Sequence, residues 1–154
     1  MDRGFFRRAI SIGAIAAFWA MAATPSASAD AGQSLTTQSG RLSCAVFANY
    51  PGTGPNLKVS IPAGSFAMCA PRFGSDEPGP AWPVVGLAVV DSAGNLTFHP
   101  IEGPPPAAGN LVMKYGQTYN FAGWTIASGR DGTRFTNDST GHGMFVSFDA
   151  IYAF

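Results

Sequence analysis

The sequence has few of the residues on which most enzyme and nucleic-acid chemistry depends. Only 12% of its 154 residues are charged, with nine basic residues against nine acidic ones, and it holds two His and two Cys. Without a basic surplus to neutralise phosphates, a nucleic-acid interface is not expected. The low charge and an aromatic content of 12% also argue against a disordered chain. Abundant Gly and Pro instead favour a small domain of strands and turns.

The first 29 residues have the order of a secretory signal peptide. Three arginines within residues 1–8 precede an uncharged run over residues 9–23, and Ala27 and Ala29 then form an A-x-A site. A run of 15 apolar residues is short for the roughly 20 that a membrane-spanning helix needs. We therefore expect cleavage after Ala29 and export to the cell envelope or the outside, as a single folded domain.

The export route and the charge of the mature protein follow from the same segment. The Arg7-Arg8 pair leaves the twin-arginine route open beside the general secretory route. Removal of the leader takes away three arginines and Asp2, which leaves six basic and eight acidic residues, a net charge of about −2. No Cys follows the cut site, so a lipid anchor is not expected. We expect only the transient signal peptide to contact the membrane.

Cys44 and Cys69 are the two cysteines, and outside the cytoplasm they most simply form one disulfide. The alternative, a redox or metal centre, is disfavoured because the sequence has no C-x-x-C and no His near either cysteine. Cys69 shares its strand phase with Ala67 and not with Phe66 and Met68. The bond is therefore expected to tie strand ends rather than cross the core.

Beyond residue 40 the apolar residues alternate with polar ones, which predicts strands, while Gly and Pro interrupt every longer run. A phase change at Ala122-Gly123 predicts a β-bulge, and Asp131-Gly132 predicts a hairpin tip. Nine strands are expected, over residues 42–46, 57–61, 65–69, 84–90, 95–101, 111–115, 118–126, 133–137 and 143–153.

This pattern predicts a single all-β domain over residues 41–154. We expect an immunoglobulin-like β-sandwich of about seven to nine short antiparallel strands, with a closed barrel as the alternative. Residues 30–40 are expected to form a flexible mature N-terminus. Two proline-rich stretches, over residues 71–83 and 100–109, are expected to be loops because Pro lacks the donor that a strand centre needs.

Candidate catalytic residues are few. His142 lies between two glycines, and Asp138 and Asp149 are the nearest acids in sequence. These three are the candidates for a small hydrolase, which needs a nucleophile, a base and an orienting acid. The alternative is an ordinary turn histidine, and the motif G-x-S-x-G is absent. Oxygen ligands at Asp131, Asn137 and Asp138 do not have EF-hand spacing, so no metal and no cofactor is expected.

The favoured function is a non-enzymatic binding or interaction module outside the cell, with a structural envelope component as a further alternative. Aromatic residues in loops stack on sugars, lipids or a partner protein, although a Trp at the end of a sandwich also caps the core. The partner is expected to be a protein, a glycan or a lipid. The candidate contact residues lie in the loops around 71–83 and 128–143, namely Phe73, Trp82, Arg130, Asp131 and His142.

The last 40 residues contain the pieces G-W-T-I, G-T-R-F-T-N-D-x-T-G-H-G-M-F-V-S and a final Y-A-F. In these pieces, about a third of the chain resembles the C-terminal part of small secreted proteins of mycobacteria and related actinobacteria. The resemblance implies export and a β fold. It carries no catalytic residue across, and it places His142 in a recurring loop.

Overall fold

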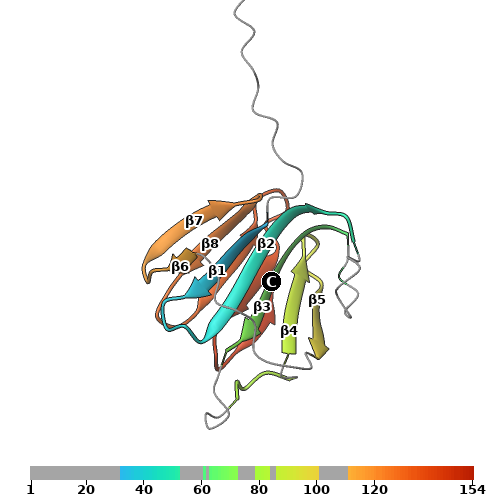
Figure 1. Ribbon diagram of the computed structural model, residues 1–154. Coiled ribbons are helices and arrows are strands. Elements are labelled where there is room, and N and C mark those ends of the chain that lie inside the picture. Colours follow the sequence, from blue (N-terminus) through green and yellow to red (C-terminus); the bar gives the residue numbers. More distant parts are fainter. Residues whose placement is uncertain (1–31, 53–60, 62, 73–78, 84–85, 101–110) are drawn as a thin grey trace, which may run out of the picture.

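The computed structural model of the chain describes residues 32–52, 61, 63–72, 79–83, 86–100 and 111–154. These residues form eleven strands in two sheets and no helix. Figure 1 shows the two layers, the blue-to-yellow strands β1 to β5 and the orange-to-red strands of the second sheet. Within the described ranges no helix is long and apolar enough to cross a membrane. The expectation of an all-β, two-sheet fold is confirmed.

The first sheet has the strand order β5-β4-β3-β2-β1-β6 and is mixed. Neighbouring strands are antiparallel except for β1 and β6, which run parallel with Leu35 opposite Leu111. Its strands are β1 (Gln33–Thr37), β2 (Leu42–Tyr50), β3 (Gly64–Pro71), β4 (Gly86–Asp91), β5 (Leu96–Pro100) and β6 (Leu111–Met113).

The second sheet is antiparallel throughout and follows the chain, in the order β11-β10-β9-β8-β7. Since β1 to β5 stay in one sheet and β7 to β11 in the other, the alternation between sheets that defines the immunoglobulin topology is not shown. The strands are β7 (Gln117–Phe121), β8 (Trp124–Ser128), β9 (Thr133–Asn137), β10 (Gly143–Val146) and β11 (Ile151–Ala153).

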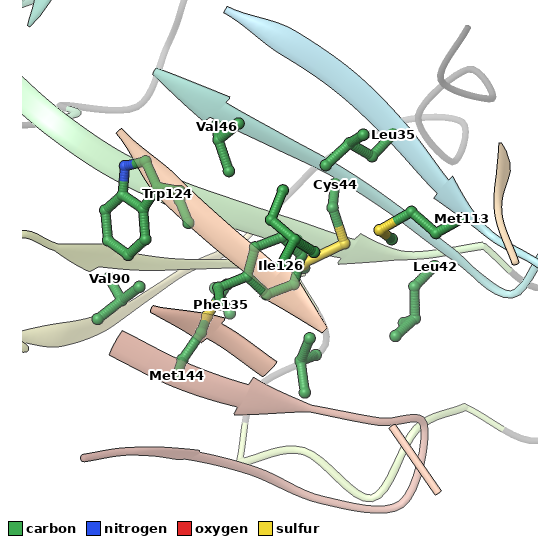
Figure 2. Packing of buried hydrophobic residues seen from close by; sticks show 14 of the residues in the cluster. Leu35, Leu42, Cys44, Val46, Val90, Met113, Trp124, Ile126, Phe135 and Met144 are labelled. Atoms are coloured by element: carbon green, nitrogen blue, oxygen red, sulfur yellow. A yellow bond between two sulfur atoms is a disulfide. The ribbon is translucent and has the colours of Figure 1, made fainter. Parts of the chain in front are cut away.

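The core lies between the sheets and is made by alternate residues of each strand. Trp124 and Ile126 of β8 and Phe135 of β9 are fully buried and face the inner side of the first sheet (Figure 2). The period-two pattern of the sequence therefore corresponds to burial. In β4, Val90 points into this core, while Val89 packs in a second cluster with Ile61 and Phe66. This second cluster explains why β4 is apolar on both faces.

Three segments differ from the sequence expectation. Residues 33–37, expected within a flexible N-terminus, form β1 because Leu35 is buried and the backbone pairs with both β2 and β6. The expected bulge at Ala122-Gly123 is wrong. Phe121 and Trp124 pair directly, and Ala122 and Gly123 have φ of 53° and 76°, as the central residues of a tight hairpin turn require.

The expected strand over residues 143–153 is two strands. Ser147 donates its backbone N–H to Ala150 O at 2.8 Å, which closes a turn, and Val146 then pairs with Ile151. The expected strand over residues 57–61 lies outside the described residues except for Ile61, which is not in a strand. The hairpin predicted at Asp131-Gly132 is confirmed, because it joins β8 to β9.

The predicted disulfide between Cys44 and Cys69 is confirmed. The two residues are register partners on adjacent strands β2 and β3, and both are buried on the inner face of the first sheet. The bond therefore joins strands within one sheet and does not link the two sheets. It lies among paired residues within both strands, not at the strand ends as the sequence expectation had it.

Replacing both cysteines tests the contribution of this bond. The double substitution Cys44→Ala, Cys69→Ala should lower the free energy of unfolding by about 3 kcal/mol, because it frees a loop of about 25 residues in the unfolded chain. Urea unfolding followed by tryptophan fluorescence measures the loss, and an unchanged far-ultraviolet circular dichroism spectrum shows that the fold is kept. A loss under about 1 kcal/mol would contradict the loop-closure argument.

Candidate functional site

The strand connections of the second sheet place the predicted site residues at opposite ends of the sandwich. The β8–β9 and β10–β11 turns, which carry Arg130, Asp131 and Asp149, lie at one end. The β9–β10 turn, which carries Asp138 and His142, lies at the other end. The length of β10 thus separates His142 from Asp149. The structure does not bring the five residues together into one site.

His142 is exposed and has no Asp or Glu partner among the described residues. Its Nδ1 lies 3.2 Å from the main-chain oxygen of Phe154, and its own carbonyl accepts a hydrogen bond from the backbone of Asn137. The neighbouring carboxylate of Asp138 accepts a 2.6 Å hydrogen bond from the hydroxyl of Thr125 instead. The contact between a base and its orienting acid, on which triad chemistry depends, is not formed here.

Asn137 organises the loop that contains His142. It is 3% exposed, and its Oδ1 accepts hydrogen bonds from the backbone and hydroxyl of Ser139 and from the hydroxyl of Thr140. Its Nδ2 donates to the hydroxyl oxygen of Ser65 at 3.2 Å, which also accepts the indole N–H of Trp124 at 2.9 Å. Ser65 belongs to the first sheet and Trp124 to the second. This loop therefore contributes a polar link between the sheets.

The link predicts a large effect of substitution at Asn137. The variant Asn137→Ala should lower the free energy of unfolding by about 2–3 kcal/mol, because it removes the hydrogen bonds that the buried Asn137 amide makes to Ser65, Ser139 and Thr140. Equilibrium unfolding in urea measures the loss. His142→Ala is the matched control in the same loop, and its loss should be under about 0.5 kcal/mol because the side chain is exposed. Equal losses in the two variants would contradict this account.

The β4–β5 hairpin contacts the same loop and is held by Asp91. Its Oδ1 accepts the backbone N–H groups of Ala93 and Asn95, both at 2.9 Å, and its Oδ2 accepts the side-chain amide of Asn95 at 2.8 Å. Burial acts to raise the pKa of the Asp91 carboxyl, but these hydrogen bonds outweigh it, so the pKa lies below its ordinary value of 3.8. The hydroxyl of Thr140 joins the hairpin to the loop through Ser92 O at 2.6 Å.

The depressed pKa of Asp91 predicts a pH dependence of stability. The folded state favours the ionised carboxyl, so this stabilisation is complete above the unfolded pKa near 3.8. It is lost as the pH falls through the lower folded pKa. Thermal unfolding from pH 6 to pH 2 should show the wild type more stable than Asp91→Asn at the upper end, with the two converging at the lower end. Asn95→Ala should weaken the effect. A constant difference across the range would contradict the assignment.

A cleft of about 220 Å³ lies at the other end of the sandwich, between the turns of the two sheets. The β1–β2 turn contributes from the first sheet, and the β8–β9 and β10–β11 turns contribute from the second. It is lined by Thr37, Ser39, Arg41, Leu42, Tyr115, Gly129, Arg130, Asp131, Gly132, Thr133, Val146, Ser147, Phe148 and Asp149. The predicted binding residues Arg130 and Asp131 are therefore part of one concave site.

Two arginines of this cleft stack on aromatic rings. The guanidinium carbon of Arg41 lies 3.5 Å from the ring centre of Phe148, and that of Arg130 lies 5.5 Å from the ring centre of Tyr115. Within the part of the chain that the structure describes, neither guanidinium forms an ion pair or donates a hydrogen bond. Stacking fixes the plane of a guanidinium but leaves the N–H groups at its edge available.

Trp82 is buried beside the β10–β11 turn and is not one of the residues that line the cleft. Its indole is 7% exposed and belongs to the core cluster, and its Nε1 donates a 2.8 Å hydrogen bond to Ser147 O. The backbone N–H of Ala81 also donates to Phe148 O at 3.1 Å. Trp82 thus has the capping role that the sequence left as the alternative. Phe73, its predicted neighbour in binding, lies outside the described residues.

Arg41, Tyr115 and Phe148 are cleft residues that sequence reasoning missed. They come from three segments far apart in the chain. They meet because β1 pairs with β6 and because the turns at this end of the two sheets lie around one cleft. Among the residues described, no cluster of three His, Cys, Asp or Glu side chains could hold a metal ion.

No family model matches the chain, and no significant match to a curated protein or a solved structure was found.

Proposed function

We propose that this chain is an exported binding module whose ligand site is the cleft formed by the β1–β2, β8–β9 and β10–β11 turns. One observation carries the proposal. Two arginines line one concave site between the sheets, and the guanidinium of each lies over an aromatic ring and has no ion-pair partner in the described residues. Concave sites with a few convergent polar groups are where small molecules bind.

Export is part of the proposal and is supported by the leader pattern and by the buried Cys44–Cys69 disulfide. Disulfides persist in oxidising surroundings outside the cytoplasm. The resemblance of the last 40 residues to small secreted actinobacterial proteins points the same way. We place the protein at the cell surface or in the medium.

Binding is favoured over hydrolysis by the position of His142. The lining residues of the cleft include no His and no Cys, so the groups that usually act as general base or as activated thiol are absent from it. His142 lies at the opposite end of β10, where it is exposed and close to the main-chain oxygen of Phe154. The lining of the cleft therefore provides charged side chains and a concave surface for binding, but no His or Cys to act as a base or a nucleophile.

Titration of the purified exported protein with a set of sugars, sugar acids and amino acids tests the proposal by two-dimensional amide NMR. Ligands should shift the resonances of Tyr115 and Arg130, and Arg130→Ala should weaken binding by about tenfold or more. Arg134→Ala is the matched control, because its guanidinium also stacks on an aromatic ring, that of Phe154, but does not line the cleft. If ligands shift only residues elsewhere, the cleft is not the site.

A further inference from the structure

The composition of the cleft indicates the class of its ligand, an inference that rests on the proposed function. Its volume of about 220 Å³ is below the roughly 300–1,000 Å³ of sites for drug-sized molecules. The cleft therefore has room for one small molecule or for one unit of a longer polymer. Within this space the ligand must pair with the charged and hydrogen-bonding groups of the lining residues.

The arginines require an acceptor with two oxygens. A guanidinium held against a ring presents a planar fork of N–H donors, which matches a carboxylate or a phosphate bidentately. Arg41 and Arg130 both line the same cleft, and each guanidinium lies over an aromatic ring of that lining. A neutral ligand would leave both forks without the charged acceptor that gives the stronger hydrogen bonds.

The two carboxylates of the cleft select between these anions. Asp131 and Asp149 line the cleft together with the two arginines, so the formal charge of its lining is zero. A dianionic phosphate would meet two like charges and be disfavoured. A singly charged carboxylate that also carries hydroxyl donors would satisfy the guanidinium groups with its charge and the aspartates with its hydroxyls.

The aspartates are held by their own turns. The backbone N–H of Asp149 donates to the hydroxyl of Ser147 at 3.2 Å, and this hydroxyl also accepts the backbone N–H of Ala150 at 2.9 Å. A Cβ on Gly129 would lie only 2.5 Å from Oδ1 of Asp131, so the glycine allows that carboxylate to approach the backbone. We propose that the cleft binds a sugar acid, with its carboxylate on Arg41 and Arg130 and its hydroxyls on Asp131 and Asp149.

Calorimetric titration with D-glucuronate, D-glucose, D-glucose 6-phosphate and L-alanine tests the inference. Glucuronate should bind at least about tenfold more tightly than glucose, which differs mainly in lacking the carboxylate. It should also bind more tightly than the phosphate ester and the zwitterion. The double variant Arg41→Gln, Arg130→Gln should lose this preference while Arg134→Gln keeps it, and thermal unfolding of both variants checks that they fold.

The outcomes separate the ligand class from the proposed function. If glucose, the phosphate ester or alanine binds as tightly as glucuronate and shifts the Tyr115 resonance, the sugar-acid inference is overturned and the binding function stands. If glucuronate binds equally well to the folded double variant, its site is elsewhere and the inference is also overturned. If no compound of the larger set shifts a cleft resonance, the proposed function itself fails. Polygalacturonate, tested against free glucuronate, distinguishes a polymer unit from a free sugar acid.

Discussion

The packing of Trp124, Ile126 and Phe135 against the inner face of the first sheet is the contact on which the rest of the structure depends. Each sheet alone would leave one apolar face in water. Burial of these faces fixes the distance between the sheets and so aligns the turns at their ends. The cleft exists because the β1–β2, β8–β9 and β10–β11 turns and Tyr115 of the β6–β7 connection meet around it. Its geometry is therefore a consequence of the core.

The two ends of the sandwich use polar groups in opposite ways. At the end that carries His142, Asn137 and Ser65 satisfy one another and their neighbours, and the loop is held by hydrogen bonds from both sheets. At the cleft end, Arg41 and Arg130 have aromatic neighbours but no carboxylate partner within the described chain. Groups that are mutually satisfied contribute to stability, whereas donors left available contribute to recognition. The loop that contains His142 is thus the one with the denser hydrogen bonding.

The sequence predicts the all-β class, the disulfide and most strands because burial in a sandwich imposes a period of two. It fails at β1, because Gln33–Thr37 is polar except for Leu35, although pairing with two neighbouring strands leaves Leu35, Thr36 and Thr37 all buried. It also fails at the β7–β8 turn, because Ala122 is not a residue type that marks positive φ. Of the residues predicted to bind a partner, Trp82 and His142 do not line the cleft, whereas Arg130 and Asp131 do. Arg41, Tyr115 and Phe148 join them only through sheet pairing, which no local pattern contains.

The energetic argument for recognition depends on what the arginines do without a ligand. A guanidinium that reaches water is well solvated, so the lack of an ion pair to any described residue costs the protein little. Stacking on Phe148 and Tyr115 removes part of its conformational freedom before any ligand arrives. A ligand that reaches both groups therefore loses less entropy on binding than one that must order free side chains. In this way a domain with only 12% charged residues concentrates four of its charges at one concave site.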